Sequence, residues 1–193
     1  MTKKKQGKKT SKKTVKKSVK KKTSKNKSGA TVTLGGNPVS VGGKLPARGK
    51  SLPKFSLTTS ALQEISNKDV AGKRVIFNIF PSIDTPTCAT STRKFNEIAA
   101  RLQNTEIICV SADLPFAQGR FCGAEGISNV KTASSFRSNF GSTFGVNLTS
   151  GVLKGVLARA VVVADEKGKV LHTELVGEIA NEPNYDAAIN SLR

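Results

Sequence analysis

Three cysteines, Cys88, Cys109 and Cys122, are the residues of this sequence best suited to nucleophilic or redox chemistry. Cys88 follows an apolar, β-branched run at 74–80 and begins a segment at 88–102 whose apolar residues have helical spacing. A residue at such a junction sits in the first helical turn, where unpaired N–H groups and the helix dipole favour a thiolate over a thiol. The thiolate is the reactive form, so Cys88 is either a nucleophile or an inert buried cysteine.

His172 is the only histidine, which argues against a zinc site and against a catalytic triad. A zinc site would need cysteine and carboxylate ligands at spacings that the sequence lacks. A Ser-His-Asp arrangement would depend on this single histidine. No C-x-x-C pair occurs, so a general thiol–disulfide oxidoreductase is disfavoured.

The charge of the chain is unevenly distributed. The 193 residues carry 32 basic and 13 acidic side chains, for a net charge of +19. Residues 1–28 contain fourteen of the lysines and no acid, so residues 29–193 are only mildly basic. We predict a disordered lysine-rich tail at 1–28 and one folded domain at 29–193.

The tail has two interpretations. A lysine-rich arm attracts polyanions, which predicts non-specific binding of nucleic acid or another polyanion. No aromatic residue is interleaved with the lysines, so base stacking is not expected. The alternative is a solubilising extension, or a start codon assigned upstream of the true one.

Membrane and secretory segments are not expected. No run of about 18 apolar residues occurs, so the sequence predicts no transmembrane segment. No apolar stretch follows the basic N-terminus, which argues against a secretory signal. Three cysteines are too few, and their number is odd, for a disulfide-rich secreted scaffold. We therefore expect a cytoplasmic protein without a membrane partner.

Strands alternate with helices along 29–193, which predicts an α/β layer fold. A central strand at 74–80 is followed by a helix at 88–102 and a second buried strand at 106–112. The other expected strands are 31–34, 39–41, 55–58, 159–164 and 170–176, the other expected helices are 116–123, 134–140 and 184–192, and 61–67 is weakly helical or irregular.

The residues around Cys88 carry a resemblance to a known family. Pro81, Thr85 and Cys88 fit the P-x-x-x-[ST]-x-x-C motif of the peroxiredoxins. Four further segments resemble the thiol peroxidases, or atypical two-cysteine peroxiredoxins; they are 78–85, 111–118, 120–126 and 153–163. The resemblance implies a thioredoxin-like fold of the peroxiredoxin type with an N-terminal β-hairpin. It also implies a homodimer that reduces hydrogen peroxide and organic hydroperoxides with thioredoxin as electron donor, and that needs no cofactor or metal.

The resemblance also implies roles for the motif residues. Cys88 would be the peroxidatic nucleophile, and Thr85 would hydrogen-bond both thiolate and peroxide. Pro81 would shield the reacting atoms from water. Arg159 would stabilise the thiolate and the developing oxyanion, although its position alone suits a surface arginine at a strand end.

Two cysteines remain as partners for Cys88. Cys109 lies inside the apolar strand at 106–112 and fits a small core residue. Cys122 lies near the end of an expected helix and corresponds to the resolving cysteine, which implies a Cys88–Cys122 disulfide; otherwise it is a second buried thiol. A different class of function is also open, namely a nucleic-acid-associated redox sensor with negligible peroxide turnover.

Overall fold

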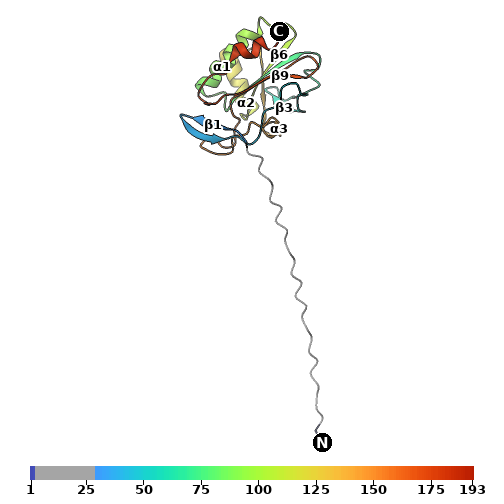
Figure 1. Ribbon diagram of the computed structural model, residues 1–193, viewed down its shortest axis with the longest axis vertical. Coiled ribbons are helices and arrows are strands. Elements are labelled where there is room, and N and C mark those ends of the chain that lie inside the picture. Colours follow the sequence, from blue (N-terminus) through green and yellow to red (C-terminus); the bar gives the residue numbers. More distant parts are fainter. Residues whose placement is uncertain (3–28) are drawn as a thin grey trace.

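The computed structural model describes residues 1–2 and 29–193, and the folded part begins at residue 29 (Figure 1). The expected disorder of the tail at 1–28 falls almost entirely outside the described residues. The folded part is a mixed α/β arrangement, as the alternation of strands and helices predicts.

A mixed sheet forms the centre of residues 29–193, with seven strands in the order β4-β3-β7-β6-β5-β8-β9. Its strands are β3 (Ser56–Thr59), β4 (Glu64–Ser66), β5 (Arg74–Ile79), β6 (Thr105–Ser111), β7 (Lys131–Ser134), β8 (Ala160–Ala164) and β9 (Val170–Leu175). The three middle strands β7, β6 and β5 are parallel, and β8 is antiparallel to β5. Strands β5, β6 and β8 are mostly apolar, which suits strands that are covered on both faces of the sheet.

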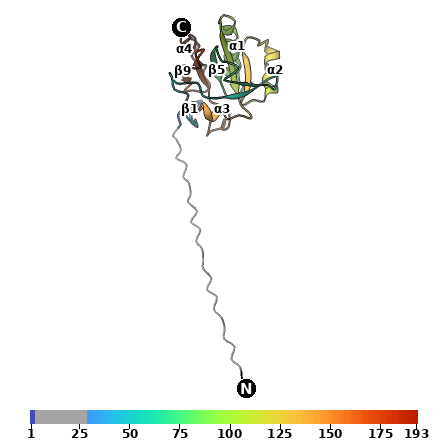
Figure 2. The ribbon, with the colours of Figure 1, turned by 90° about the vertical axis from the view of Figure 1, so that its right-hand side faces the viewer.

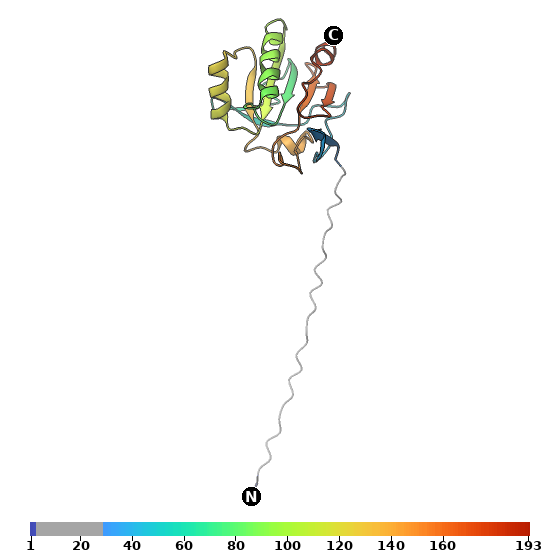
Figure 3. The ribbon, with the colours of Figure 1, turned by 90° about the vertical axis from the view of Figure 1, so that its left-hand side faces the viewer.

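Helices cover the two faces of this sheet unequally (Figure 2; Figure 3). One face packs against α1 (Pro86–Ala99), α2 (Pro115–Glu125) and α4 (Tyr185–Asn190). The other face packs against an aromatic cluster that includes the short helix α3 (Phe140–Thr143). Helices α1 and α2 are the crossovers that connect the parallel strands β5, β6 and β7.

The predicted N-terminal hairpin is present and forms a separate two-stranded sheet. It consists of β1 (Thr31–Leu34) and β2 (Asn37–Ser40), joined by a two-glycine turn. Its apolar side chains pack on Leu148, Ala158 and Ile179 in a third small cluster. The hairpin is therefore attached to the segment that precedes β8 and to the segment that follows β9.

The structure corrects two parts of the prediction. Residues 61–67, expected to be weakly helical or irregular, contain β4, which pairs with β3. Residues 134–140, expected to be a helix, begin at the end of β7 and continue as a loop to α3. Strand β7 has the sequence Lys-Thr-Ala-Ser and no apolar run, so its pairing with β6 and β3, and not its side-chain pattern, makes it a strand.

Within residues 1–2 and 29–193, no helix is both long enough and apolar enough to cross a bilayer.

Candidate active site

Cys88 lies in the first turn of α1, which follows β5 after a short loop. Pro81 is buried just after that strand, and Pro86 begins the helix, where its fixed φ angle suits the first position. Thr85 is the N-cap, with an extended backbone. The helix begins two residues earlier than predicted, which makes Cys88 its third residue. Cys88 therefore still lies near the positive end of the helix dipole, in a first turn that contains no acidic residue.

The sulfur of Cys88 is buried but has polar partners. The Thr85 hydroxyl donates to Cys88 Sγ at 2.8 Å, and Arg159 Nη2 donates to it at 3.4 Å. The Thr85 side chain makes no capping bond to the helix; its hydroxyl faces the sulfur and the Ser82 carbonyl oxygen, which lies at 3.1 Å. A hydroxyl and a guanidinium thus both donate to one sulfur at a helix N-terminus, which is the arrangement of donors that binds an anion.

Arg159 is a buried cation, with only 2% of its surface exposed. It directly precedes β8, and its Nε donates to the carbonyl oxygen of Ile179 at 2.8 Å. Its Nη1 is buried and has no hydrogen-bond partner among the described residues. A buried donor without an acceptor is costly, so this nitrogen is available to a ligand oxygen close to Cys88.

The backbone at Cys88 is also fixed from inside the helix. Ser91 and Thr92 donate to the Cys88 carbonyl oxygen at 3.0 Å and 2.9 Å. Both side chains are fully buried, and Asn78 of β5 donates to the Ser91 hydroxyl at 3.3 Å. These bonds connect the first turn of α1 to the central strand beneath it.

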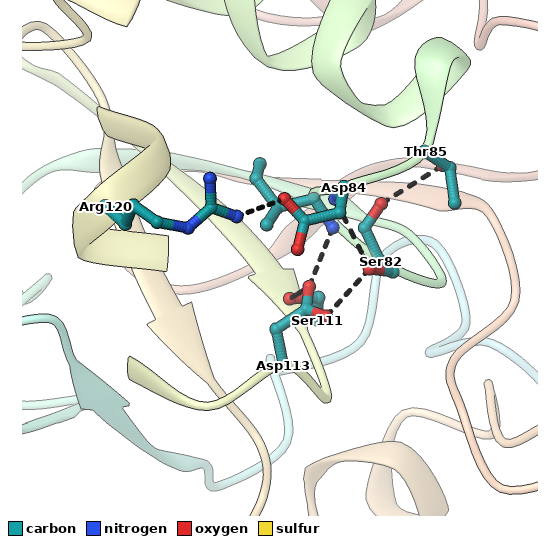
Figure 4. Close-up of polar contacts among 7 residues, drawn as sticks. Ser82, Asp84, Thr85, Ser111, Asp113 and Arg120 are labelled. Atoms are coloured by element: carbon teal, nitrogen blue, oxygen red, sulfur yellow. Dashed lines mark hydrogen bonds and ion pairs between the residues drawn. The ribbon is translucent and has the colours of Figure 1, made fainter. Parts of the chain in front are cut away.

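Asp113 holds the loop between β5 and α1, as Figure 4 shows. Its carboxylate accepts from the Ser82 hydroxyl at 2.8 Å and from the Ile83 N–H at 2.7 Å. A third donor is the Ser111 hydroxyl at 2.7 Å. Asp113 thus anchors the loop that presents Thr85 to the sulfur.

Cys122 lies on α2 in a less constrained setting. Its side chain is half-buried, and its polar contact is with the Thr132 hydroxyl at 3.5 Å. It packs against the same apolar cluster as Cys88, and all three thiols are free. Helix α2 is joined to the Cys88 loop by an ion pair between Arg120 and Asp84, 2.7 Å apart (Figure 4).

Cys109 has the surroundings of a core residue, as predicted. It is fully buried in β6, and the Asn78 amide donates to its sulfur at 3.5 Å. Burial raises the pKa of the Cys109 thiol to about 12. This thiol is therefore protonated at neutral pH and is a poor nucleophile.

The structure brings together three of the predicted site residues, Cys88, Thr85 and Arg159. Arg159 is not the surface residue that its position alone suggested. Asp113 was not among the predicted site residues, although it lies within the segment 111–118 and follows a buried strand, which is a position where a carboxylate needs a partner. The Ile179 carbonyl could not be predicted, since a backbone group leaves no trace in the sequence.

A family model and similar solved structures show the class of protein to which the chain belongs. Residues 47–189 match the Redoxin family model. The structure is similar to that of a peroxiredoxin-like protein from Aquifex aeolicus, with a TM-score of 0.79, 44% identity and coverage of 83% of this chain and 94% of that one. It also shares its fold with a thiol peroxidase from Chromobacterium violaceum, with a TM-score of 0.77 at 21% identity, over 83% and 93% of the two chains. The predicted thioredoxin-like fold of the peroxiredoxin type is confirmed.

Relatives in sequence show the group within this class that the chain resembles. The chain is 55% identical over 157 residues to a thiol peroxidase of Corynebacterium glutamicum, which covers 81% of this chain and 95% of that protein. It is 54% identical over 163 residues to a thiol peroxidase of Mycobacterium tuberculosis, with coverage of 84% and 98%. The chain therefore belongs to the Redoxin family, in its thiol peroxidase group, and is a peroxiredoxin enzyme with peroxidase activity.

Proposed function

We propose that this enzyme reduces hydrogen peroxide and organic hydroperoxides to water and alcohols, with Cys88 as the peroxidatic cysteine and Cys122 as the resolving cysteine. Thioredoxin returns the oxidised enzyme to the dithiol form. The observation that carries the proposal is the contact of Arg159 and Thr85 with the Cys88 sulfur, together with the unpartnered Nη1 of the same guanidinium.

In the first step the Cys88 thiolate attacks one peroxide oxygen. The S–O bond forms as the O–O bond breaks, and two electrons pass from sulfur to the peroxide. The departing oxygen takes up the proton that the thiol gave up, which yields alcohol or water, and Cys88 becomes a sulfenic acid. Arg159 stabilises the thiolate through Nη2 and offers Nη1 to the leaving oxygen.

Thr85 and Pro81 support this step. A hydroxyl has one hydrogen and two lone pairs, so Thr85 can donate to the sulfur and still accept from a peroxide O–H. Pro81 is buried and has no N–H group, and in our proposal it helps to exclude water from the reacting atoms. Because Cys88 has no exposed surface in the reduced state, a peroxide enters with a small movement of the loop at 82–85.

In the second step the Cys122 thiol attacks the sulfenic sulfur. The S–S bond forms and water leaves, so the atoms balance without another reactant. A disulfide requires Cα atoms within about 4.4–6.8 Å, and both thiols are free in this state. Unwinding at Cys122 is supported by its half-buried position, its single weak polar contact and the adjacent Gly123.

A reductant must then open the disulfide. A dithiol protein such as thioredoxin attacks one sulfur, its second thiol completes the exchange, and the electrons pass to Cys88 and Cys122. A cytoplasmic setting, where thiols are kept reduced, suits this cycle.

A homodimer is the proposed assembly. Three large apolar side chains, Leu114, Phe116 and Phe136, are 51%, 67% and 44% exposed. Their two segments adjoin, because the Ser134 hydroxyl donates to the Asp113 carbonyl oxygen. Sedimentation of the wild type and of Phe116→Ser tests the assembly, and a monomeric wild type would contradict it.

Mass spectrometry after one equivalent of peroxide tests the chemistry. We expect a Cys88–Cys122 disulfide with Cys109 free, and no thioredoxin-dependent peroxide consumption in Cys88→Ser. Unchanged turnover in that variant would end the proposal. A Cys88–Cys109 disulfide would end the assignment of Cys122 as resolving cysteine.

A second function is favoured by the tail, whose residues lie outside the described part of the chain except for the first two. We propose that residues 1–28 bind nucleic acid or another polyanion, because they hold fourteen lysines and no acid. If six to ten phosphates are engaged, affinity falls roughly 10³- to 10⁵-fold between 50 and 200 mM salt. Fluorescence anisotropy with labelled DNA measures this, against a full chain in which the fourteen lysines are replaced by glutamine. Equal binding by both chains would refute the proposal.

A further inference from the structure

The loop formed by residues 177–180 lies between the N-terminal hairpin and the active site. On the hairpin side, the Ile179 N–H donates to the Thr33 carbonyl oxygen at 2.8 Å. On the active-site side, the Ile179 carbonyl accepts from Arg159 Nε at 2.8 Å. The next carbonyl, that of Ala180, accepts from the Thr87 hydroxyl in the first turn of α1 at 3.0 Å. The 177–180 loop therefore contacts both the guanidinium and the helix turn that surround Cys88.

Glu178 joins this loop to the hairpin through its carboxylate. The N–H groups of Gly35 and Gly36 donate to it, each at 3.1 Å, and the Thr33 hydroxyl donates at 2.9 Å. The Ala180 N–H of the same loop donates at 3.1 Å. These hydrogen bonds, led by those from Ala180 and Gly36, lower the pKa of Glu178 to about 2, so the carboxylate stays charged at neutral and mildly acidic pH.

The hairpin turn is built to offer these donors. Gly35 and Gly36 have φ angles of +58° and +79°, in the left-handed region that glycine adopts readily. Two such residues in succession form the tight turn that suits a two-residue hairpin. The turn presents both N–H groups to the Glu178 carboxylate.

We propose that Glu178 is a positioning residue for peroxide reduction, which acts by fixing the 177–180 loop so that the Ile179 carbonyl orients Arg159. Among the described residues, this carbonyl is the only oxygen that accepts a hydrogen bond from the Arg159 guanidinium. A shift of the loop therefore moves Nη2 away from Cys88 Sγ and moves Nη1 as well. The inference rests on the proposed function, since it assumes that Arg159 acts on the sulfur and the peroxide.

The β1–β2 hairpin thereby has a part in the chemistry. Its turn contacts neither Cys88 nor Arg159 by a hydrogen bond in the described part of the chain, but it holds the carboxylate that holds the loop. Glu178 touches no reacting atom, and its effect passes through Arg159.

Glu178→Gln in the full chain tests the proposal, because glutamine keeps the size of the side chain and removes its charge. The second-order rate constant for oxidation of Cys88 by hydrogen peroxide is measured in a single turnover. We expect it to fall about tenfold, since a misplacement of about 1 Å at a catalytic group can cost on the order of 10²-fold. We also expect the pH profile of Cys88 alkylation by iodoacetamide to move to higher pH, which a general loss of stability does not cause.

Glu174→Gln is the matched control. Glu174 lies on β9 and accepts the Asn184 N–H through its carboxylate, so the change removes the same charge and a comparable backbone bond. We expect a wild-type rate constant and a wild-type pH profile for this variant. The same loss of rate in both variants would overturn the proposal.

A double-mutant cycle separates this proposal from the proposed function. Arg159→Lys alone should slow oxidation of Cys88, and Glu178→Gln should add nothing further in that background, since both changes act through one group. A slow Arg159→Lys with a wild-type Glu178→Gln would overturn the positioning role and leave the function intact. An Arg159→Lys variant with the wild-type rate would overturn both.

Thr33→Val provides a milder test if Glu178→Gln does not fold. It removes one donor to the carboxylate without changing the shape of the side chain. The pH profile should move in the same direction by a smaller amount. An unchanged profile in Thr33→Val, or a slower Glu178→Gln whose profile does not move, would overturn the proposal.

Discussion

The first turn of α1 and the end of α2 each carry a cysteine that packs on the same apolar cluster, but the two are held very differently. Cys88 is fully buried, and its sulfur and its carbonyl oxygen each have two hydrogen-bond donors. Cys122 is half-buried and has one contact, 3.5 Å long, to a hydroxyl. The first setting holds the sulfur in a fixed position, and the second allows the thiol to change its position.

The attachments of the two helices follow the same division. Buried hydroxyls and a buried guanidinium hold α1. The first half of helix α2 is anchored by the buried Gln118, which donates to the Ser111 hydroxyl at 2.8 Å. The polar contacts near Cys122 are instead two exposed ion pairs, Arg120–Asp84 and Arg93–Glu125, the second of which joins α2 to α1. Exposed pairs of this kind contribute little to stability. Local unwinding of the end of α2 around Cys122 should therefore require less free energy than unwinding of the first turn of α1.

The largest effect should come from Cys88→Ser. The serine hydroxyl keeps the hydrogen-bonding position but is not a thiolate, so peroxide consumption should fall on the order of 10⁴-fold or more. The measurement is hydrogen peroxide consumption with a dithiol reductant. Cys109→Ala is the control and should keep its activity. If Cys88→Ser retains activity, Cys88 is not the cysteine that reacts with peroxide.

Cys122→Ser should leave the first step intact and block the second. Because Cys122 makes no hydrogen bond to Cys88, the rate of Cys88 oxidation should stay within about twofold of wild type. The sulfenic acid should persist and be trapped by dimedone, and no intramolecular disulfide should form. Mass spectrometry measures both products. A disulfide between Cys88 and Cys109 in this variant would show that the mobility of Cys122 is not what makes it the partner of Cys88.

Asp113→Asn should loosen the loop that presents Thr85 to the sulfur. The amide replaces a carboxylate that accepts three donors, so the rate of Cys88 oxidation should fall about tenfold. Stopped-flow kinetics with hydrogen peroxide measures this rate. Asp165→Asn is a matched control, because Asp165 accepts two backbone N–H groups in the turn between β8 and β9. Equal losses in both variants would mean that the Asp113 network has no special link to Cys88.

Arg120→Gln should have the smallest effect, and in the opposite direction. Removing an exposed ion pair that joins α2 to Asp84 should speed disulfide formation by about 1.5- to 5-fold. The rate of disulfide closure is followed after rapid oxidation of Cys88. Lys73→Gln removes an exposed ion pair with Glu106 outside α2 and should leave closure unchanged. Slower closure in Arg120→Gln would indicate that the pair guides Cys122 toward Cys88.

Apolar patterning made most of the fold predictable. The central strands β5, β6 and β8 are mostly apolar, and each was predicted to within two residues at either end. Strands β4 and β7 were missed because they are short and largely polar, so their backbone pairing alone defines them. The start of α1 was misjudged by two residues, since Pro86 fits equally a loop or the first helical position.

The site was predictable only where a local motif exists. Pro81, Thr85 and Cys88 lie within eight residues, and their spacing indicates the helix turn at which they meet. The approach of Arg159, 71 positions away, depended on the resemblance to a family. Glu178 gave no signal, because its hairpin donors lie 142 to 145 positions upstream and two of them are backbone groups. The roles of these residues stay predictions until the variants are measured.

Cys109 and Cys122 should become accessible through two different opening motions of the molecule. The Cys109 thiol lies between the central strand β6 and the helices that cover this face of the sheet, and burial raises its pKa to about 12, so a maleimide should react with it only after those helices separate from the sheet. Cys122 becomes accessible when α2 alone unwinds. Parallel labelling of the two sulfurs in one sample therefore compares the opening of the helix-covered face of the sheet with the unwinding of α2 alone, without an engineered cysteine.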